Sequence, residues 1–263
     1  MSADGRPGTG TTTGPGVHSA GPKENDGTVE TALHGEVAVI TLKRPAKLNA
    51  LSTGLEAALL DALRSPLVRA GRAVLVTGGD RVFSAGADVG ELREMTPEAI
   101  TAYYRASGAV YEEFASLPQP TVAAIAGYCL GGGLELALAA DIRVADESAV
   151  FALPEVGIGI LPSSGGVTRL VKAVGPARTR DLVLRGRRMP VAEAHAWGLL
   201  SEVTPDGGHF GRALEIANEL AAQPPLAVSI AKQVIGAATD APREAALLLE
   251  QLAYAALNRT GTA

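Results

Sequence analysis

The chain has 263 residues, of which 47% are apolar and 19% are charged, so it fits one large or two small globular domains and is not an intrinsically disordered protein. Its formal net charge of −5 excludes the strongly basic surface of a typical nucleic-acid-binding protein. The single cysteine, Cys129, excludes an internal disulfide framework and any metal site built from several cysteines.

The first 28 residues differ in composition from the rest of the chain. Gly, Thr and Pro dominate residues 1–28, and no apolar stretch of a secretory signal occurs there, so we predict a disordered tail. The longest uncharged run lies between Glu113 and Glu135, but Pro118, Pro120 and four glycines interrupt it. We therefore expect a buried strand and a turn there instead of a membrane span, and we predict a cytoplasmic protein with no membrane partner.

Alternating β-branched residues predict strands, and apolar residues at helical spacing predict helices. The predicted strands are Glu36–Leu42, Arg72–Thr77, Thr121–Ala126 and Ile142–Ala145. The predicted helices are Thr53–Arg64, Gly90–Ser116 with an interruption near Thr96-Pro97, Leu134–Ala140, Val191–Trp197, Arg212–Ala222, Leu226–Ala237 and Arg243–Leu257. This order predicts an α/β fold, with a body over residues 29–198 and a helical region over residues 199–263.

Several common catalytic motifs are absent from the sequence. It contains no P-loop, no G-x-S-x-G nucleophile elbow and no G-x-G-x-x-G after a strand. The four histidines, His18, His34, His195 and His209, are scattered along the chain, as surface or structural histidines are. We therefore expect neither a metal site nor a bound cofactor.

The segment Ala126–Asp141 (AGYCLGGGLELALAAD) has an unusual pattern for a plain hydrophobic core. Three glycines, Gly131 to Gly133, stand where a helix is predicted to begin, and free N–H groups at a helix N-terminus favour developing negative charge. Glu135 is the only charged residue among apolar neighbours. It is either a buried carboxyl with a raised pKa, suited to acid–base chemistry, or a solvent-facing carboxylate that offsets the helix dipole.

Two further segments carry candidate residues. Glu155 is the only charge in Ser148–Gly166 (SAVFALPEVGIGILPSSGG), and it is either a solvated turn carboxylate or the partner of Glu135 in an acid–base pair. In Arg81–Gly90 (RVFSAGADVG), the small residues would admit a ligand close to the backbone. A loop that enters a helix with Asp88 near its N-terminus has the same pattern, so both interpretations stay open.

Five segments carry a family resemblance, in one consistent order from about Glu36 to Asn258. They read VITLKRPAKLNALS, VFSAGADV, IAGYCLGGGLELALAADIRVA, FALPEVGIGILPSSGGVTRL and RGRRMPVAEAHAWGLLSEV. Together they resemble the crotonase, or enoyl-CoA hydratase/isomerase, superfamily. The resemblance implies a ββα-spiral fold, a helical C-terminal region that packs trimers, often as dimers of trimers, and an acyl-CoA thioester as substrate.

The resemblance also implies roles for individual residues. Ala87 and Gly132 match the two backbone N–H donors of the family's oxyanion hole, and Glu135 and Glu155 match the two glutamates of the hydratases. In a hydratase, Glu135 would activate the water that attacks Cβ of a 2-enoyl-CoA, and Glu155 would exchange the proton at Cα. Residues that match positions near CoA or the substrate are Ala46, Lys47, Leu48, Ala85, Ala87, Asp88, Val89 and Gly90.

Three other functions stay open at this point. The stretches FALPE and GRRM look like carnitinyl-CoA dehydratases, which also keep both glutamates. An enoyl-CoA isomerase usually needs only one carboxylate base. A non-catalytic scaffold would suit a C-terminus that stops soon after ALNRT, where the family usually continues into a helix that completes the CoA pocket. We expect some CoA contacts to be missing for that reason.

Overall fold

The computed structural model describes residues 27–259, so most of the predicted tail lies outside the described residues. A six-stranded sheet has the order β1-β2-β3-β4-β6-β9. Its strands are β1 (Thr28–His34), β2 (Val37–Lys43), β3 (Ala73–Thr77), β4 (Thr121–Ile125), β6 (Ile142–Asp146) and β9 (Glu202–Thr204). Only β1 runs antiparallel to its neighbour. A second sheet, in the order β5-β7-β8, contains β5 (Tyr128–Leu130), β7 (Val150–Ala152) and β8 (Met189–Pro190).

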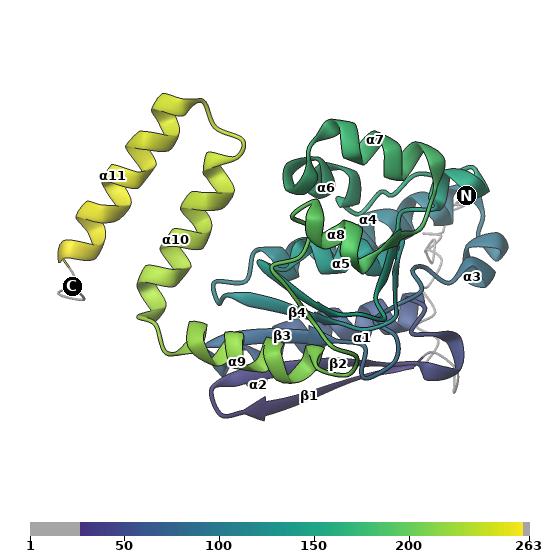
Figure 1. Cartoon of the computed structure of the whole chain (residues 1–263), viewed down its shortest axis with the longest axis horizontal. Coiled ribbons are helices and arrows are strands. Elements are labelled where there is room, and N and C mark those ends of the chain that lie inside the picture. Colours follow the sequence, from purple (N-terminus) through teal and green to yellow (C-terminus); the bar gives the residue numbers. More distant parts are fainter. Residues whose placement is uncertain (1–26, 260–263) are drawn as a thin grey trace, which may run out of the picture.

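The central strands are covered on both faces. All five residues of β3 and all five of β4 are buried, as expected for a parallel sheet between helical layers. Alternate residues point to opposite sides: Val74 joins the core with α1 (Thr53–Arg64), α4 (Pro97–Ala115) and α5 (Gly132–Ala139), while Leu75 packs with α9 (His209–Ala221). Figure 1 shows α9 on the opposite side of the sheet from α5.

The strongly periodic segments form the predicted elements. The four predicted strands correspond to β2, β3, β4 and β6, and Thr53–Arg64 is α1 without any change of boundary. Residues 90–116 contain α3 (Val89–Glu94) and α4, and the side chain of Thr96 caps α4 at the predicted interruption. The predicted helices after residue 190 are α8 (Val191–Ala196), α9, α10 (Pro225–Ala238) and α11 (Arg243–Arg259).

Several elements were not predicted from the sequence. They are β1, β5, β7, β8, β9, α2 (Pro66–Ala70), α6 (Gly166–Val174), α7 (Pro176–Arg185) and two 3-10 turns, Pro45–Lys47 and Glu155–Ile158. The short strands have three residues or fewer, and pairing with distant strands defines them more than local pattern does. β1 begins at Thr28, the last residue of the predicted tail, and is largely exposed at the sheet edge.

The C-terminal region differs from the prediction of a separate helical part that begins at residue 199. β9 extends the main sheet beside β6, and α9 covers one face of that sheet, so both belong to the α/β body. α10 and α11 pack against each other beside the body (Figure 1), and Lys232 on α10 forms an ion pair with Asp141 at 2.8 Å. Neither helix contains a buried residue. Among the described residues, no helix is long and apolar enough to cross a membrane.

Candidate active site

The two segments predicted to contact CoA lie side by side. The N–H of Ala85 donates to the carbonyl of Leu48 at 3.0 Å, and the N–H of Leu51 donates to the carbonyl of Gly86 at 2.8 Å. The N–H of Asp88 completes the pairing by donating to the carbonyl of Leu51 at 3.0 Å. Residues 45–51 and 84–90, which are distant in sequence, thus form one continuous wall.

Asp88 holds this wall together with its side chain. Its Oδ1 accepts the N–H groups of Gly90 and Glu91 at the start of α3, and its Oδ2 lies 2.7 Å from Nη1 of Arg44. Burial opposes ionisation of Asp88, but the hydrogen bond from Arg44 and the two N–H donors outweigh it and hold the pKa below its usual value. The carboxylate therefore caps a helix and forms an ion pair, the structural alternative raised by the sequence.

We expect Asp88→Asn to lower the free energy of unfolding by about 1–2 kcal/mol at neutral pH, because the amide loses the ion pair and weakens the cap. The folded-state pKa of Asp88 is depressed, so this stabilisation is present above the unfolded-state pKa of about 3.9 and is lost as the pH falls through the folded-state value. Urea unfolding of both proteins at pH 7 and below pH 4 measures the effect. Equal stabilities at pH 7 would contradict it.

The two predicted donors of the oxyanion hole also lie close together. Ala87 pairs with Leu51 in a parallel bridge, whose hydrogen bonds use the N–H groups of Leu51 and Asp88, so the N–H of Ala87 points to the other side. Gly132 is the first residue of α5, where a helical N–H has no acceptor in its own helix. A Cβ atom at Gly132 would lie 3.6 Å from the nitrogen of Ala87. The backbone at Gly132 and the nitrogen of Ala87 are therefore neighbours, as the two donors of one oxyanion hole would be.

Glu135 lies in the first turn of α5 and is only 4% exposed. Its Oε1 accepts the N–H groups of Ser164 at 2.8 Å and Gly166 at 2.9 Å. Burial raises the pKa of Glu135, while these two N–H donors and the nearby Arg169 act in the opposite direction. The solvent-facing alternative from the sequence is therefore wrong, because the carboxyl is buried, and the acid–base role of Glu135 stays a prediction.

Glu155 begins the 3-10 turn Glu155–Ile158 and lies against the start of α5. A Cβ atom at Gly131 would be 2.8 Å from Oε1 of Glu155. Its Oε2 is buried and has no hydrogen-bond partner within the described residues. Burial and the nearby charge of Glu135 raise the pKa of Glu155 to about 7, against the effect of its own backbone N–H. The interpretation of Glu155 as a solvated turn carboxylate is therefore wrong. Glu135 lies close enough for its charge to influence the ionisation of Glu155.

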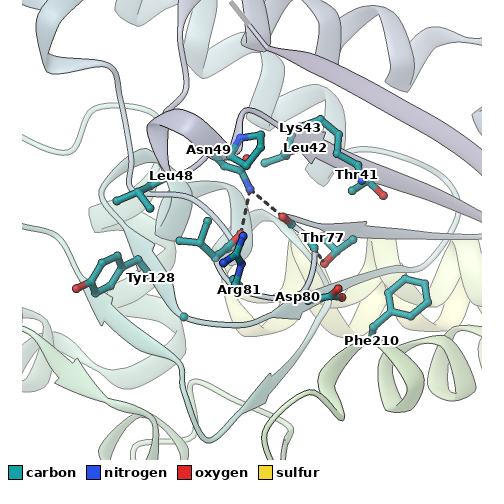
Figure 2. Close-up of a pocket in the computed structure, with 15 residues that line it drawn as sticks. Thr41, Leu42, Lys43, Leu48, Asn49, Thr77, Asp80, Arg81, Tyr128 and Phe210 are labelled. Atoms are coloured by element: carbon teal, nitrogen blue, oxygen red, sulfur yellow. Dashed lines mark hydrogen bonds between the residues drawn. The ribbon is translucent and has the colours of Figure 1, made fainter.

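A cavity of about 690 Å³ opens beside the wall formed by the two paired segments. Figure 2 shows Leu48 and Tyr128 on one side of it, Phe210 on the other and Arg81 between them. Lys43, Asp80 and Arg81 are its charged lining residues, so its net charge is positive. Of the residues predicted to contact CoA, only Leu48 lines this cavity, and neither glutamate does. Ala46, Lys47, Val89 and Gly90 are exposed on the surface nearby.

Sequence reasoning missed the polar residues behind the two glutamates. Ser164 and Arg169 gave no signal, because their contacts with Glu135 and with each other arise only in the folded chain. Glu56 did leave a signal in the sequence. It stands three residues before Leu59 and seven before Leu63, on the buried face of α1. A charged residue inside an apolar helical stripe is a candidate for a buried, hydrogen-bonded role.

Comparison with known proteins assigns this chain to a family. The family model described as enoyl-CoA hydratase/isomerase matches residues 33–260. The chain belongs to the enoyl-CoA hydratase/isomerase family. The crotonase-like fold expected from the sequence is confirmed, since a crystal structure of an enoyl-CoA hydratase from Bacillus anthracis superimposes with a TM-score of 0.84 at 34% identity, over 88% of this chain and 91% of that one.

Two curated relatives of this enoyl-CoA hydratase/isomerase family member differ in name. A protein of Dictyostelium discoideum named "Probable enoyl-CoA hydratase, mitochondrial" is 36% identical over 81% of this chain and 76% of its own length. A carnitinyl-CoA dehydratase of Salmonella enteritidis is 40% identical over 80% of this chain and 81% of its own length. The described residues contain no group of three or more His, Cys, Asp or Glu side chains that could hold a metal ion.

Proposed function

We propose that this protein is an enoyl-CoA hydratase, a hydro-lyase that adds water reversibly across the 2,3 double bond of a 2-enoyl-CoA to give a 3-hydroxyacyl-CoA. One observation carries the proposal: the carboxyls of Glu135, which is buried, and of Glu155, whose Oε2 is buried, lie at the same end of α5 as the N–H groups of Ala87 and Gly132. Addition of water to a conjugated thioester needs a base, an acid and donors for the developing enolate oxygen, and this arrangement provides all three.

The roles of the residues follow from their surroundings. The thioester oxygen would lie between the N–H groups of Ala87 and Gly132, where its charge develops. Glu135, ionised and held by two N–H donors, would take a proton from water while the water oxygen forms the bond to Cβ. Glu155 would then deliver its proton to Cα, and dehydration reverses each step. These transfers need only the two carboxyls, so we propose that no bound cofactor takes part.

The CoA portion is proposed to lie along the wall formed by residues 45–51 and 84–90. Lys47 is exposed beside this wall, and Lys43 and Arg81 add positive charge in the adjoining cavity. Phosphate groups of CoA would be attracted to these cations. Backbone contacts at Ala85 and Val89 would guide the pantetheine arm, while the side chain of Asp88 keeps the wall in place.

The experiment that tests the proposal uses crotonyl-CoA and follows the loss of the conjugated-enone absorbance, with mass spectrometry of the product. Turnover by the unmodified protein to 3-hydroxybutyryl-CoA supports a hydratase. The Salmonella relative favours carnitinyl-CoA dehydration as the second candidate, so crotonobetainyl-CoA is assayed in parallel. Turnover of that substrate alone would replace the generic hydratase, a migrated double bond would indicate an isomerase, and no turnover of either ester by the folded protein would favour a non-catalytic role.

The pH dependence should report the second carboxyl. In the hydration direction Glu155 must carry a proton, and its pKa is raised to about 7. We therefore expect the hydration rate to fall as the pH rises through about 7, with an apparent value that belongs to the coupled pair of glutamates. Initial rates of crotonyl-CoA hydration between pH 5 and 9 measure it. A rate that is flat or rising through this range contradicts the assigned role of Glu155.

We also propose a homotrimer or a dimer of trimers, located in the cytoplasm. The support for assembly is the apolar surface of α10 and α11. Its exposed residues are Leu226, Ile235, Leu247, Leu248, Leu249, Leu252 and Tyr254. Exposed apolar area of this kind is usual at subunit contacts.

Light scattering after gel filtration should give about three or six times the chain mass. Replacing Leu248 and Leu252 with Lys should shift the mass towards one chain, and a monomer in the unmodified protein contradicts the proposal.

A further inference from the structure

A third buried carboxyl lies behind the proposed active site. Glu56, on α1, is 4% exposed, and its Oε1 accepts two hydrogen bonds from α4. The hydroxyl of Ser107 donates at 2.7 Å, and the hydroxyl of Tyr111 donates at 2.9 Å. A buried carboxyl is costly to keep unless it is well bonded, and this one is not used by the proposed hydration chemistry.

The hydrogen bonds continue from Ser107 towards Glu135. Its oxygen lies 3.1 Å from the hydroxyl oxygen of Ser164. A serine hydroxyl has one proton, and Ser107 gives its own to Glu56, so Ser164 must be the donor in this contact. The backbone N–H of the same Ser164 donates to Oε1 of Glu135. The chain of contacts therefore runs from Glu56 through two hydroxyls to the residue that clamps the proposed base.

A second set of contacts links Glu56 to the proposed oxyanion hole. The hydroxyl of Tyr111, which is held by Glu56, would be 3.0 Å from a Cβ atom at Gly132. Tyr111 is 1% exposed, so its ring is fixed between α1 and α5. The Tyr111 hydroxyl thus packs directly behind the first residue of α5. A shift of this ring would displace the N–H of Gly132 from the position that the thioester oxygen requires.

We propose that Glu56 is a positioning residue that holds both halves of the active site, the clamp on Glu135 through Ser107 and Ser164, and the oxyanion donor at Gly132 through Tyr111. This inference rests on the hydratase chemistry proposed above. It predicts that the carboxylate of Glu56 acts on turnover and not on the affinity for the CoA ester, since the two hydrogen bonds that it accepts come from α4 and not from the wall along which CoA is proposed to bind.

The charged groups around Glu56 agree with a positioning role for it. The charged and titratable groups that face Glu56 are Glu91 on α3, Tyr103 and Tyr111 on α4 and Glu135 on α5. Burial, and to a smaller degree the charges of Glu135 and Glu91, raise the pKa of Glu56 to about 7, against the two hydroxyl donors. The pKa of Glu135 depends on its burial, on the N–H groups of Gly166 and Ser164 and on Arg169, so we infer that Glu56 acts on Glu135 through position and not through charge.

The test compares two replacements of Glu56. Glu56→Ala removes the acceptor, and we expect kcat for crotonyl-CoA to fall about 10–100-fold with KM changed less than about threefold, as misplacement of catalytic groups would cause. Glu56→Gln keeps an oxygen that can accept from both hydroxyls, so it should restore most of kcat. Glu113→Gln is the matched control, because Glu113 also links α4 to α1 through Arg64 but lies on the surface.

Ser107→Ala keeps the test decisive if Glu56→Ala fails to fold, since it breaks the link to Ser164 and leaves the carboxyl. We expect a lower kcat with little change in KM. Unchanged kcat in Ser107→Ala would overturn the inference while leaving the hydratase intact. Absence of turnover in the unmodified protein would instead refute the proposed function itself, so the two failures are distinguishable.

Discussion

Glu135→Gln is expected to slow the hydration of crotonyl-CoA by about 10²–10⁴-fold, the usual contribution of a positioned general base. The amide can still accept the N–H groups of Ser164 and Gly166 through its oxygen, so the loop and α5 should keep their positions. What the amide cannot do is take the proton of the attacking water. Stopped-assay measurement of 3-hydroxybutyryl-CoA gives the rate over several decades.

Binding of a saturated ester separates chemistry from folding in this variant. Butyryl-CoA has no double bond to hydrate, and calorimetric titration should give a Kd within about threefold of the unmodified protein, since Glu135 contributes to a later step. Glu113→Gln again serves as the control for the loss of one carboxylate. A Glu135→Gln protein with more than half of the original rate would remove Glu135 from the mechanism and leave Glu155 as the only base.

Gly132→Pro is expected to lower kcat/KM by about 10²–10³-fold, the usual cost of losing one oxyanion donor. Proline is tolerated at the first position of a helix, because its missing N–H has no helical acceptor there. Gly132 occupies that position in α5. The replacement therefore removes the proposed donor at the place in the helix where the backbone tolerates it best.

Gly132→Ala is the matched control for this experiment. Its Cβ atom meets the same neighbours, the hydroxyl of Tyr111 at 3.0 Å and Cδ1 of Leu51 at 3.2 Å, but the N–H remains. We expect a loss of less than about tenfold, as some repacking is required. Equal losses in the two variants would mean that crowding and not the N–H determines the rate, which would contradict an oxyanion hole at Gly132.

The sequence alone determined the elements whose pattern is local. The apolar run of β4 and the helical spacing of α1 predict these elements because burial of one strand or helix face leaves a regular mark on the chain. The same holds for the glycines before α5 and for the lone charge of Glu135, which mark a special helix start without reference to any other segment. The resemblance carried by these segments was sufficient for the family and the fold.

The tertiary structure decided what each polar residue contacts. The sequence left Glu155 open between solvent and site, and its burial beside Gly131 settled that choice. Asp88 matched a position near CoA, yet its carboxylate holds Arg44 and a helix N-terminus. No contact of Glu56 was predicted, because its partners Ser107 and Tyr111 are 51 and 55 positions away. The free energy of a buried polar group depends on hydrogen-bond partners that other segments of the chain supply. The sequence around that group does not show which residues these partners are.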